Sequence, residues 1–206
     1  GFPLYILSAK LATKLFYFSE PVFVTNLYSS FVTAAALAIF FLMLGEFNIS
    51  KTSSLLATTT LGFGKTIWFH AGTTSVYSAS LLLIILLLFI FAKWYKRKQT
   101  NLIYWYALVW GISFGTHILT ITMIAPFVFM LWHIKKESSA KMRMLYSLVL
   151  FIIPFLQYLY IPWAYSRNKI INYGGADSLQ SFINYITQRG YADKIGARGI
   201  DEINQF

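Results

Sequence analysis

Long apolar runs dominate the chain and are separated by short polar segments. Four blocks contain no Asp, Glu, Lys or Arg, namely residues 21–45, 66–92, 101–133 and 144–166. A helix that crosses the hydrocarbon core of a bilayer needs about 20 residues of this kind. The pattern therefore predicts an all-α protein that forms a polytopic bundle of transmembrane helices.

Polar breaks divide these blocks into about six spans. We place the spans at residues 24–44, 54–69, 76–92, 102–115, 118–132 and 145–163. The apolar stretch 102–132 is too long for one span and contains Gly111, Gly115 and His117. Two helices joined by a tight turn are expected there, because glycine allows the chain to turn sharply.

The two ends of the chain differ from the bundle. Residues 1–23 carry Lys10 and Lys14 among apolar residues, which is typical of an amphipathic helix at the membrane interface. Residues 24–165 form the expected transmembrane bundle. Residues 166–206 are mixed and polar, and we expect an extramembrane tail or the start of a further domain. The chain opens in the middle of an apolar pattern, so we interpret it as a piece truncated at its N-terminus.

The distribution of charged residues predicts how the spans are oriented in the membrane. Only 12% of the residues are charged, about half the usual share of a soluble domain, and the net charge is +10. Eight of the 17 basic residues lie in two short segments between spans: Lys93, Lys96, Arg97, Lys98, Lys135, Lys136, Lys141 and Arg143. Such segments are typical of cytoplasmic loops, so membrane lipids rather than nucleic acid are the expected partners.

Alternation of the spans then places the other segments. Residues 45–53 fall on the cytoplasmic side, and residues 1–23, 70–75, 113–117 and the tail fall on the opposite side. No Cys is present, which excludes a disulfide framework. His70 and His117 share the non-cytoplasmic side, but neither loop holds an Asp, Glu or Cys to complete a ligand set, so we expect no metal and no cofactor.

Lys65 is the first candidate for chemistry, because it lies in the apolar stretch "GFGKTIWFHAGTTSVY" at 62–77. Its Gly-Lys-Thr resembles the end of a phosphate-binding loop, but the glycine required five positions earlier is Thr59. A nucleotide site is therefore excluded. Either the ammonium of Lys65 extends to the headgroup layer, or it points into the bundle and meets an anion.

His117 is the second candidate, since it is nearly alone in a long apolar stretch. Two interpretations stay open: a histidine satisfied by a backbone carbonyl, or a hydrogen-bond donor to a phosphate that lines a cavity at a helix break. The polar residues of the 70–77 loop lie on the same predicted side of the membrane.

Several segments together resemble a known family. They are "GFPLY" at 1–5, "TNLYSSFVTAAALAIFF" at 25–41, "TIWFHAGTTSVYSASLLL" at 66–83, "GISFGTH" at 111–117 and "NYGGADSLQSFINYITQRGYADK" at 172–194. In this order they resemble the protein O-mannosyltransferase-like membrane glycosyltransferases of the GT-C class.

The resemblance implies transfer of a sugar, mannose-like, from a polyprenyl-phosphate carrier to a protein or lipid hydroxyl on the non-cytoplasmic face. It also implies an acidic general base in an outer loop upstream of Gly1. The family often has an acidic residue at the position of Ser75, so the resemblance does not carry a second acidic role over to this chain, whereas Gly111, Gly115 and His117 match the family pattern. The candidate substrate-binding residues are His117, Lys65, Ser75, Tyr77, His70 and Asn26.

Two other classes of function stay open. A lipid or solute transporter usually has paired broken helices in an internal repeat, and the sequence indicates one break, at 111–117. A non-catalytic membrane scaffold agrees with the shortage of carboxylates, since the chain has seven and none lies within a predicted span.

Overall fold

The computed structural model describes residues 2–135, 139–167 and 178–186, and every element in these ranges is helical. The chain forms two compact units, one of residues 2–155 and one of residues 156–206 together with Gly1, and each is described by itself. The first unit holds α1 (Pro3–Leu15), α2 (Pro21–Glu46), α3 (Lys51–Gly62), α4 (Lys65–Ala71), α5 (Val76–Arg97), α6 (Asn101–Ser113), the 3-10 helix η1 (Ile118–Met123), α7 (Ile124–Ile134) and α8 (Ala140–Ile152). The 3-10 helix η2 (Ile153–Leu159) crosses the boundary, and the second unit continues with α9 (Tyr160–Arg167) and α10 (Leu179–Ile186).

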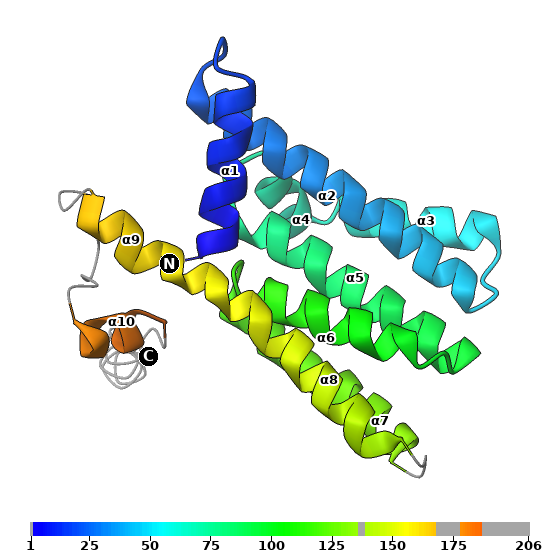
Figure 1. The fold of residues 1–206 in the computed structure, drawn as a ribbon. Coiled ribbons are helices and arrows are strands. Elements are labelled where there is room, and N and C mark those ends of the chain that lie inside the picture. The colour runs from blue at the N-terminus through cyan, green and yellow to red at the C-terminus, as the bar shows by residue number, and fades with distance from the viewer. Residues whose placement is uncertain (1, 136–138, 168–177, 187–206) are drawn as a thin grey trace, which may run out of the picture. The chain divides into compact units, whose positions relative to one another are not determined.

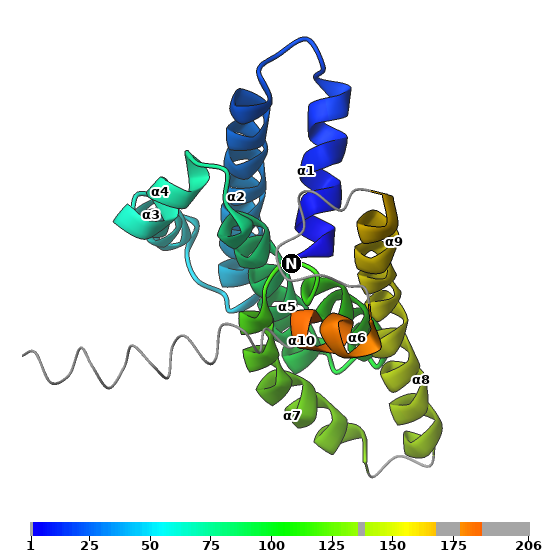
Figure 2. The same cartoon turned by 90° about the vertical axis from the view of Figure 1, so that its left-hand side faces the viewer.

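Helices α2 and α5 run side by side in the same direction (Figure 1). At their starts, the Thr74 hydroxyl, just before α5, donates to Asn26 Oδ1 over 2.8 Å. At their ends, Arg97 pairs with Glu46. The 26 residues of α2 extend about 39 Å. We call the first end of this pair the polar-aromatic end and the second the basic end. Figure 2 shows α3 and α4 on one side of α2 and α1 on the other.

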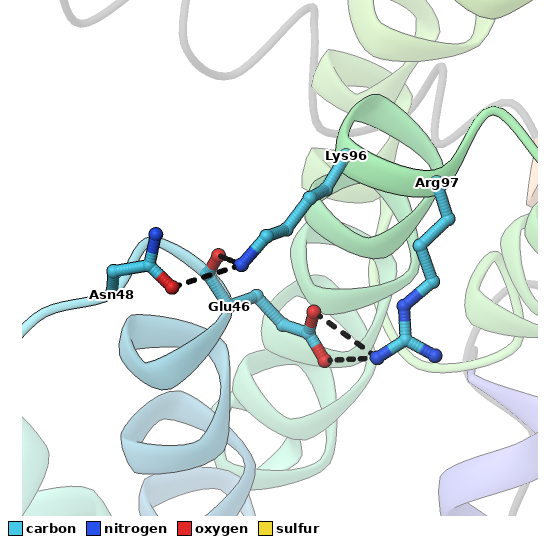
Figure 3. Close-up of polar contacts among 4 residues, drawn as sticks. All are labelled: Glu46, Asn48, Lys96 and Arg97. Carbon is cyan, nitrogen blue, oxygen red and sulfur yellow. Dashed lines mark hydrogen bonds and ion pairs between the residues drawn. The ribbon is translucent and has the colours of Figure 1, made fainter.

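The basic end is fixed by polar contacts between α2 and α5 (Figure 3). Lys96 Nζ donates to the backbone oxygen of Glu46 over 2.8 Å and to Asn48 Oδ1 over 3.0 Å. Arg97 Nη2 contacts both carboxylate oxygens of Glu46, at 3.1 and 3.3 Å. The ammonium of Lys96 also compensates the negative end of the α2 dipole. The segments 45–53 and 93–98 therefore lie at the same end of the bundle, as the charge pattern predicts.

The core of the first unit lies where α5, α6 and α7 meet. Trp94, Tyr106 and Met130 are almost completely buried there. Tyr106 Oη donates to the carbonyl of Met123 over 2.7 Å, and Trp110 Nε1 donates to the carbonyl of Thr120 over 2.8 Å. These two bonds satisfy carbonyls of η1 inside an apolar environment, where an unpaired polar group is costly. They fix the turn that follows α6.

Three helical runs of the described residues are long and apolar enough to cross a membrane. They are α2 (Pro21–Glu46), α5 (Val76–Arg97) and the continuous run of α8, η2 and α9 (Ala140–Arg167). They contain the spans predicted at 24–44, 76–92 and 145–163. The 102–132 stretch forms α6 and then η1 with α7, so two helices with a turn at 114–117 are confirmed. The count of about six spans stays a prediction.

The expectation of one continuous helix over 54–69 is wrong. The chain breaks after Gly62, and α4 begins at Lys65 with Gly64 as its N-cap. The N–H groups of Phe63 and Gly64 turn back to the carbonyls of Thr59 and Leu61. Glycine is a poor helix former, and the two closely spaced glycines weaken the helix at this point.

Candidate functional site

The polar-aromatic end joins the last turn of α4 to the first turn of α5. Ser75, the N-cap of α5, accepts the N–H of Tyr77 over 3.2 Å, and its Oγ lies 2.9 Å from His70 Nδ1. Ser78 Oγ donates to the carbonyl of His70 over 2.8 Å, and the N–H of Ser75 donates to Ser29 Oγ over 3.3 Å. Ser75 is 7% exposed. Its hydroxyl therefore both caps a helix and positions the imidazole of His70.

Four rings form a continuous row across this end, which we call the ring row: Phe2, His117, Tyr77 and His70. The Phe2 and His117 rings stack with centroids 5.1 Å apart and planes at 22°. The Tyr77 ring lies 5.1 Å from that of His117 and 4.7 Å from that of His70. The row thus brings together three predicted site residues from two loops that are about 40 positions apart in the sequence.

His117 has a defined hydrogen-bonding role. It is the N-cap of η1, and its Nδ1 accepts the N–H of Leu119 over 3.1 Å. Partial burial lowers the pKa of His117 from its ordinary value of 6.5. The imidazole is therefore neutral at pH 7, and its proton lies on Nε2, because Nδ1 is an acceptor. The interpretation in which His117 donates to a backbone carbonyl is not the one observed, since here the ring accepts from the backbone.

Asn26 lies beside the ring row through Thr74. The hydroxyl of Thr74 bonds both Asn26 Oδ1 and, at 2.6 Å, the hydroxyl of Thr25, and Thr74 directly precedes Ser75. Two adjacent residues in the first turns of α2 thus hold the segment that leads into α5. Of the six predicted residues, His70, Ser75, Tyr77, His117 and Asn26 belong to one connected set.

Lys65 lies apart from this set. It begins α4, whereas His70 lies in the last turn, and five residues of helix rise about 7.5 Å. Its side chain is exposed and lines a hollow with Phe63, Thr66, Trp68 and Phe69. No hydrogen bond or ring contact among the described residues links Lys65 to the ring row. Its part in substrate binding stays a prediction.

The sequence interpretation missed Phe2. Helix α1 begins against the turn after α6, where the N–H groups of Leu4 and Tyr5 donate to the carbonyl of Gly115 at 3.0 and 3.3 Å. The first N–H groups of a helix have no partner inside the helix, and Pro3 at the start of α1 marks where these groups fall. The sequence therefore indicated that the start of α1 requires hydrogen-bond acceptors from elsewhere, but it did not identify the carbonyl of Gly115 as that acceptor.

Metal ligands do not gather in the part of the chain that the structure describes. Residues 2–135, 139–167 and 178–186 contain no group of three or more His, Asp or Glu side chains placed to hold an ion. The residues of the ring row, with Ser75 and Asn26, offer hydroxyls, imidazoles, an amide and aromatic faces, and Glu20 adds a carboxylate at the start of α2. This set can donate hydrogen bonds to phosphate or sugar oxygens and can pack against the apolar face of a sugar.

Three helical runs of the described residues are long and apolar enough to cross a membrane, and two of them, α2 and α5, begin at the polar-aromatic end, so the fold is that of a helical protein of the membrane-spanning type. Residues 1–142 match the model of a family described as the N-terminal domain of the protein O-mannosyl-transferase TMEM260, and the chain belongs to this family. The match confirms the resemblance that the segments from "GFPLY" to "GISFGTH" indicate. No solved structure matches the chain.

Proposed function

We propose that the chain is the donor-binding part of a GT-C-type membrane glycosyltransferase, which transfers a mannose-like sugar from a polyprenyl-phosphate carrier to a protein or lipid hydroxyl. Transfer takes place on the non-cytoplasmic face. The observation that carries the proposal is the ring row with Ser75 and Asn26, in a chain of the O-mannosyl-transferase family and at the end opposite the basic one.

The reaction defines what this end must do. The bond between the sugar C1 and the carrier's phosphate oxygen breaks, and a bond forms between C1 and the acceptor oxygen. The acceptor's proton passes to a general base, and the leaving polyprenyl phosphate gains a negative charge. Hydrogen-bond donors aimed at that charge accelerate the step, because they bind the transition state better than the ground state.

His117 supplies such a donor. With Nδ1 engaged by Leu119, the Nε2–H group is the one that meets a phosphate oxygen. Tyr77 contributes a phenolic hydroxyl, and the rings of Tyr77 and Phe2 both pack against the imidazole. The resemblance to the family implies that the base is a carboxylate upstream of Gly1. Of the two described acids, Glu46 pairs with Arg97 at the basic end, and Glu20 is the N-cap residue of α2.

The test is sugar transfer by the full-length protein from a polyprenyl-phosphate sugar. A charge-assisted hydrogen bond is worth roughly 1.5–3 kcal/mol, so His117→Ala should weaken donor use by about ten-fold to a hundred-fold. His133→Ala is the matched control, since His133 lies at the end of α7 among Trp94, Phe129 and Trp132. Equal activity of the two variants would contradict the role given to His117.

A lipid or solute transporter is the second candidate, and the break between α3 and α4 favours it. Discontinuous helices are common at the substrate sites of transporters. A transporter moves a labelled polyprenyl-phosphate sugar across proteoliposomes without consuming it. Release of free polyprenyl phosphate in step with acceptor labelling supports the transferase instead.

A further inference from the structure

A groove runs along α2 beneath the break between α3 and α4, and no role assigned above uses it. Its volume is about 550 Å³. The residues that matter for the argument are Thr33, Ala34 and Leu37 of α2, Thr58 of α3, and Phe63 and Trp68 at the break. Most of this lining is apolar, with a few hydroxyls between. One of them, Thr58 Oγ1, is buried and has no hydrogen-bond partner among the described residues.

The groove connects two levels of α2. A Cβ on Gly62 would lie 2.8 Å from Leu37 Cδ1, so the end of α3 packs at the level of Leu37. The carbonyl of Ala71 accepts the hydroxyl of Ser30 over 2.8 Å, so the end of α4 lies at the level of Ser30. These seven α2 residues correspond to about 10 Å. Ala71 and Gly72 line the part of the groove at the level of Ser30, and they directly follow His70 in the sequence.

Lys65 lies on the other side of an aromatic pair. The rings of Phe63 and Trp68 stack 5.2 Å apart, and both residues line the groove as well as the hollow that contains Lys65. In the described part of the chain the two carboxylates lie elsewhere, one at the start of α2 and one paired with Arg97. A cation at this level of an apolar bundle is costly unless an anion compensates it.

We propose that this groove holds the hydrocarbon chain of a polyprenyl phosphate and that Lys65 pairs with its phosphate. The inference rests on the proposed function, and it names where the carrier lies. A single groove of this volume suits one chain rather than the two of a phospholipid. Lys65 and His70 lie about 7.5 Å apart along the axis of α4, so a phosphate between them is within reach of the flexible lysine side chain. The phosphate then lies between Lys65 and the ring row.

The experiment uses the full-length protein and a polyprenyl phosphate with a diazirine in its hydrocarbon chain. Ala34→Phe fills the groove, and Ala35→Phe is the matched control, because Ala35 is also exposed but does not line the groove. We expect photolabelled peptides from α2 and α3 in the wild type. Ala34→Phe should lower the affinity for polyprenyl phosphate at least ten-fold, while Ala35→Phe should leave it within two-fold.

Lys65→Gln tests the charge separately. It should weaken binding of polyprenyl phosphate about ten-fold and leave binding of the uncharged polyprenol unchanged. Phosphatidylglycerol, an anionic lipid with two chains, should not displace the probe. Displacement by this lipid at equal concentration would overturn the choice of occupant.

Failure of this inference is distinguishable from failure of the proposed function. If wild-type protein transfers sugar but the label lies outside α2, α3 and α4, the groove assignment is wrong and the transferase stands. If the label lies in the groove but no acceptor is glycosylated under any donor, the carrier site stands and the transferase is wrong. Equal affinity of the Ala34→Phe and Ala35→Phe proteins would also overturn the groove assignment.

Discussion

Gly111 is the position where a single methyl group should have the largest effect on stability. A Cβ added there would collide with the backbone oxygen of Phe151 in α8, and it would lie 3.0 Å from the Phe151 carbonyl carbon and 3.1 Å from Pro154 Cγ. Backbone atoms cannot rotate away, so α6 and α8 must separate. Overpacking of this kind costs typically about 1–3 kcal/mol. For a chain of this length, that corresponds to a melting temperature lower by about 2–12 °C.

Two other glycines provide matched controls for Gly111→Ala. Gly45, near the end of α2, has nothing within 4 Å of an added Cβ, so Gly45→Ala should gain up to about 1 kcal/mol of helix propensity. Gly62→Ala meets only the flexible end of Leu37 and should be nearly neutral. Thermal unfolding of the detergent-solubilised protein, followed by circular dichroism, gives the order of the three. A Gly111→Ala protein that melts at or above the Gly45→Ala protein would refute the close approach of α6 and α8.

Three further measurements test the charges and the topology. Glu46→Gln should cost only about 0.2–1 kcal/mol, since Arg97 is 49% exposed, and a double-mutant cycle with Arg97→Gln measures the coupling. Because burial lowers the pKa of His117 below 6.5, the folded state disfavours the protonated ring, so stability should fall as the pH drops below 6.5, and the His117→Gln protein should lose that part of the pH dependence. Single cysteines at Thr73 and Gln99 report sidedness in this Cys-free chain: an impermeant reagent added outside should label only the first, and labelling of the second would reverse the topology.

Hydropathy located the long helices but not their ends. The predicted spans 24–44 and 76–92 lie inside α2 and α5, which continue to Glu46 and Arg97. Charged side chains end the apolar pattern before the helix itself stops. Helix α5 ends where Lys98 adopts a left-handed conformation, with φ of 53°, and such a cap leaves little trace in hydropathy. The break at Gly64 was missed for the same reason, because an average over a span does not detect a local interruption.

The candidate site was predictable to the extent that topology determines it. Alternating spans place the loops around His70 and His117 at one end, and the structure brings both rings against Tyr77. The contact of Phe2 was not predictable, because it depends on where α1 docks. Lys65 is close to His70 in sequence, but both belong to α4, which places them at opposite ends of the helix.

The position of Ser75 explains what changes when serine replaces the acidic residue that the family often has there. A carboxylate there could still cap α5 by accepting the N–H of Tyr77, as the Ser75 hydroxyl does. It would also place a negative charge beside His70 and next to the ring row, where the proposed carrier presents its phosphate. Two like charges at such short range disfavour each other, and the cost grows in an apolar environment. Serine keeps the cap and removes that repulsion. In the proposed function the ring row therefore binds the donor's anion through neutral hydrogen-bond donors, the ammonium of Lys65 pairs with the same phosphate, and the general base is a carboxylate outside this set.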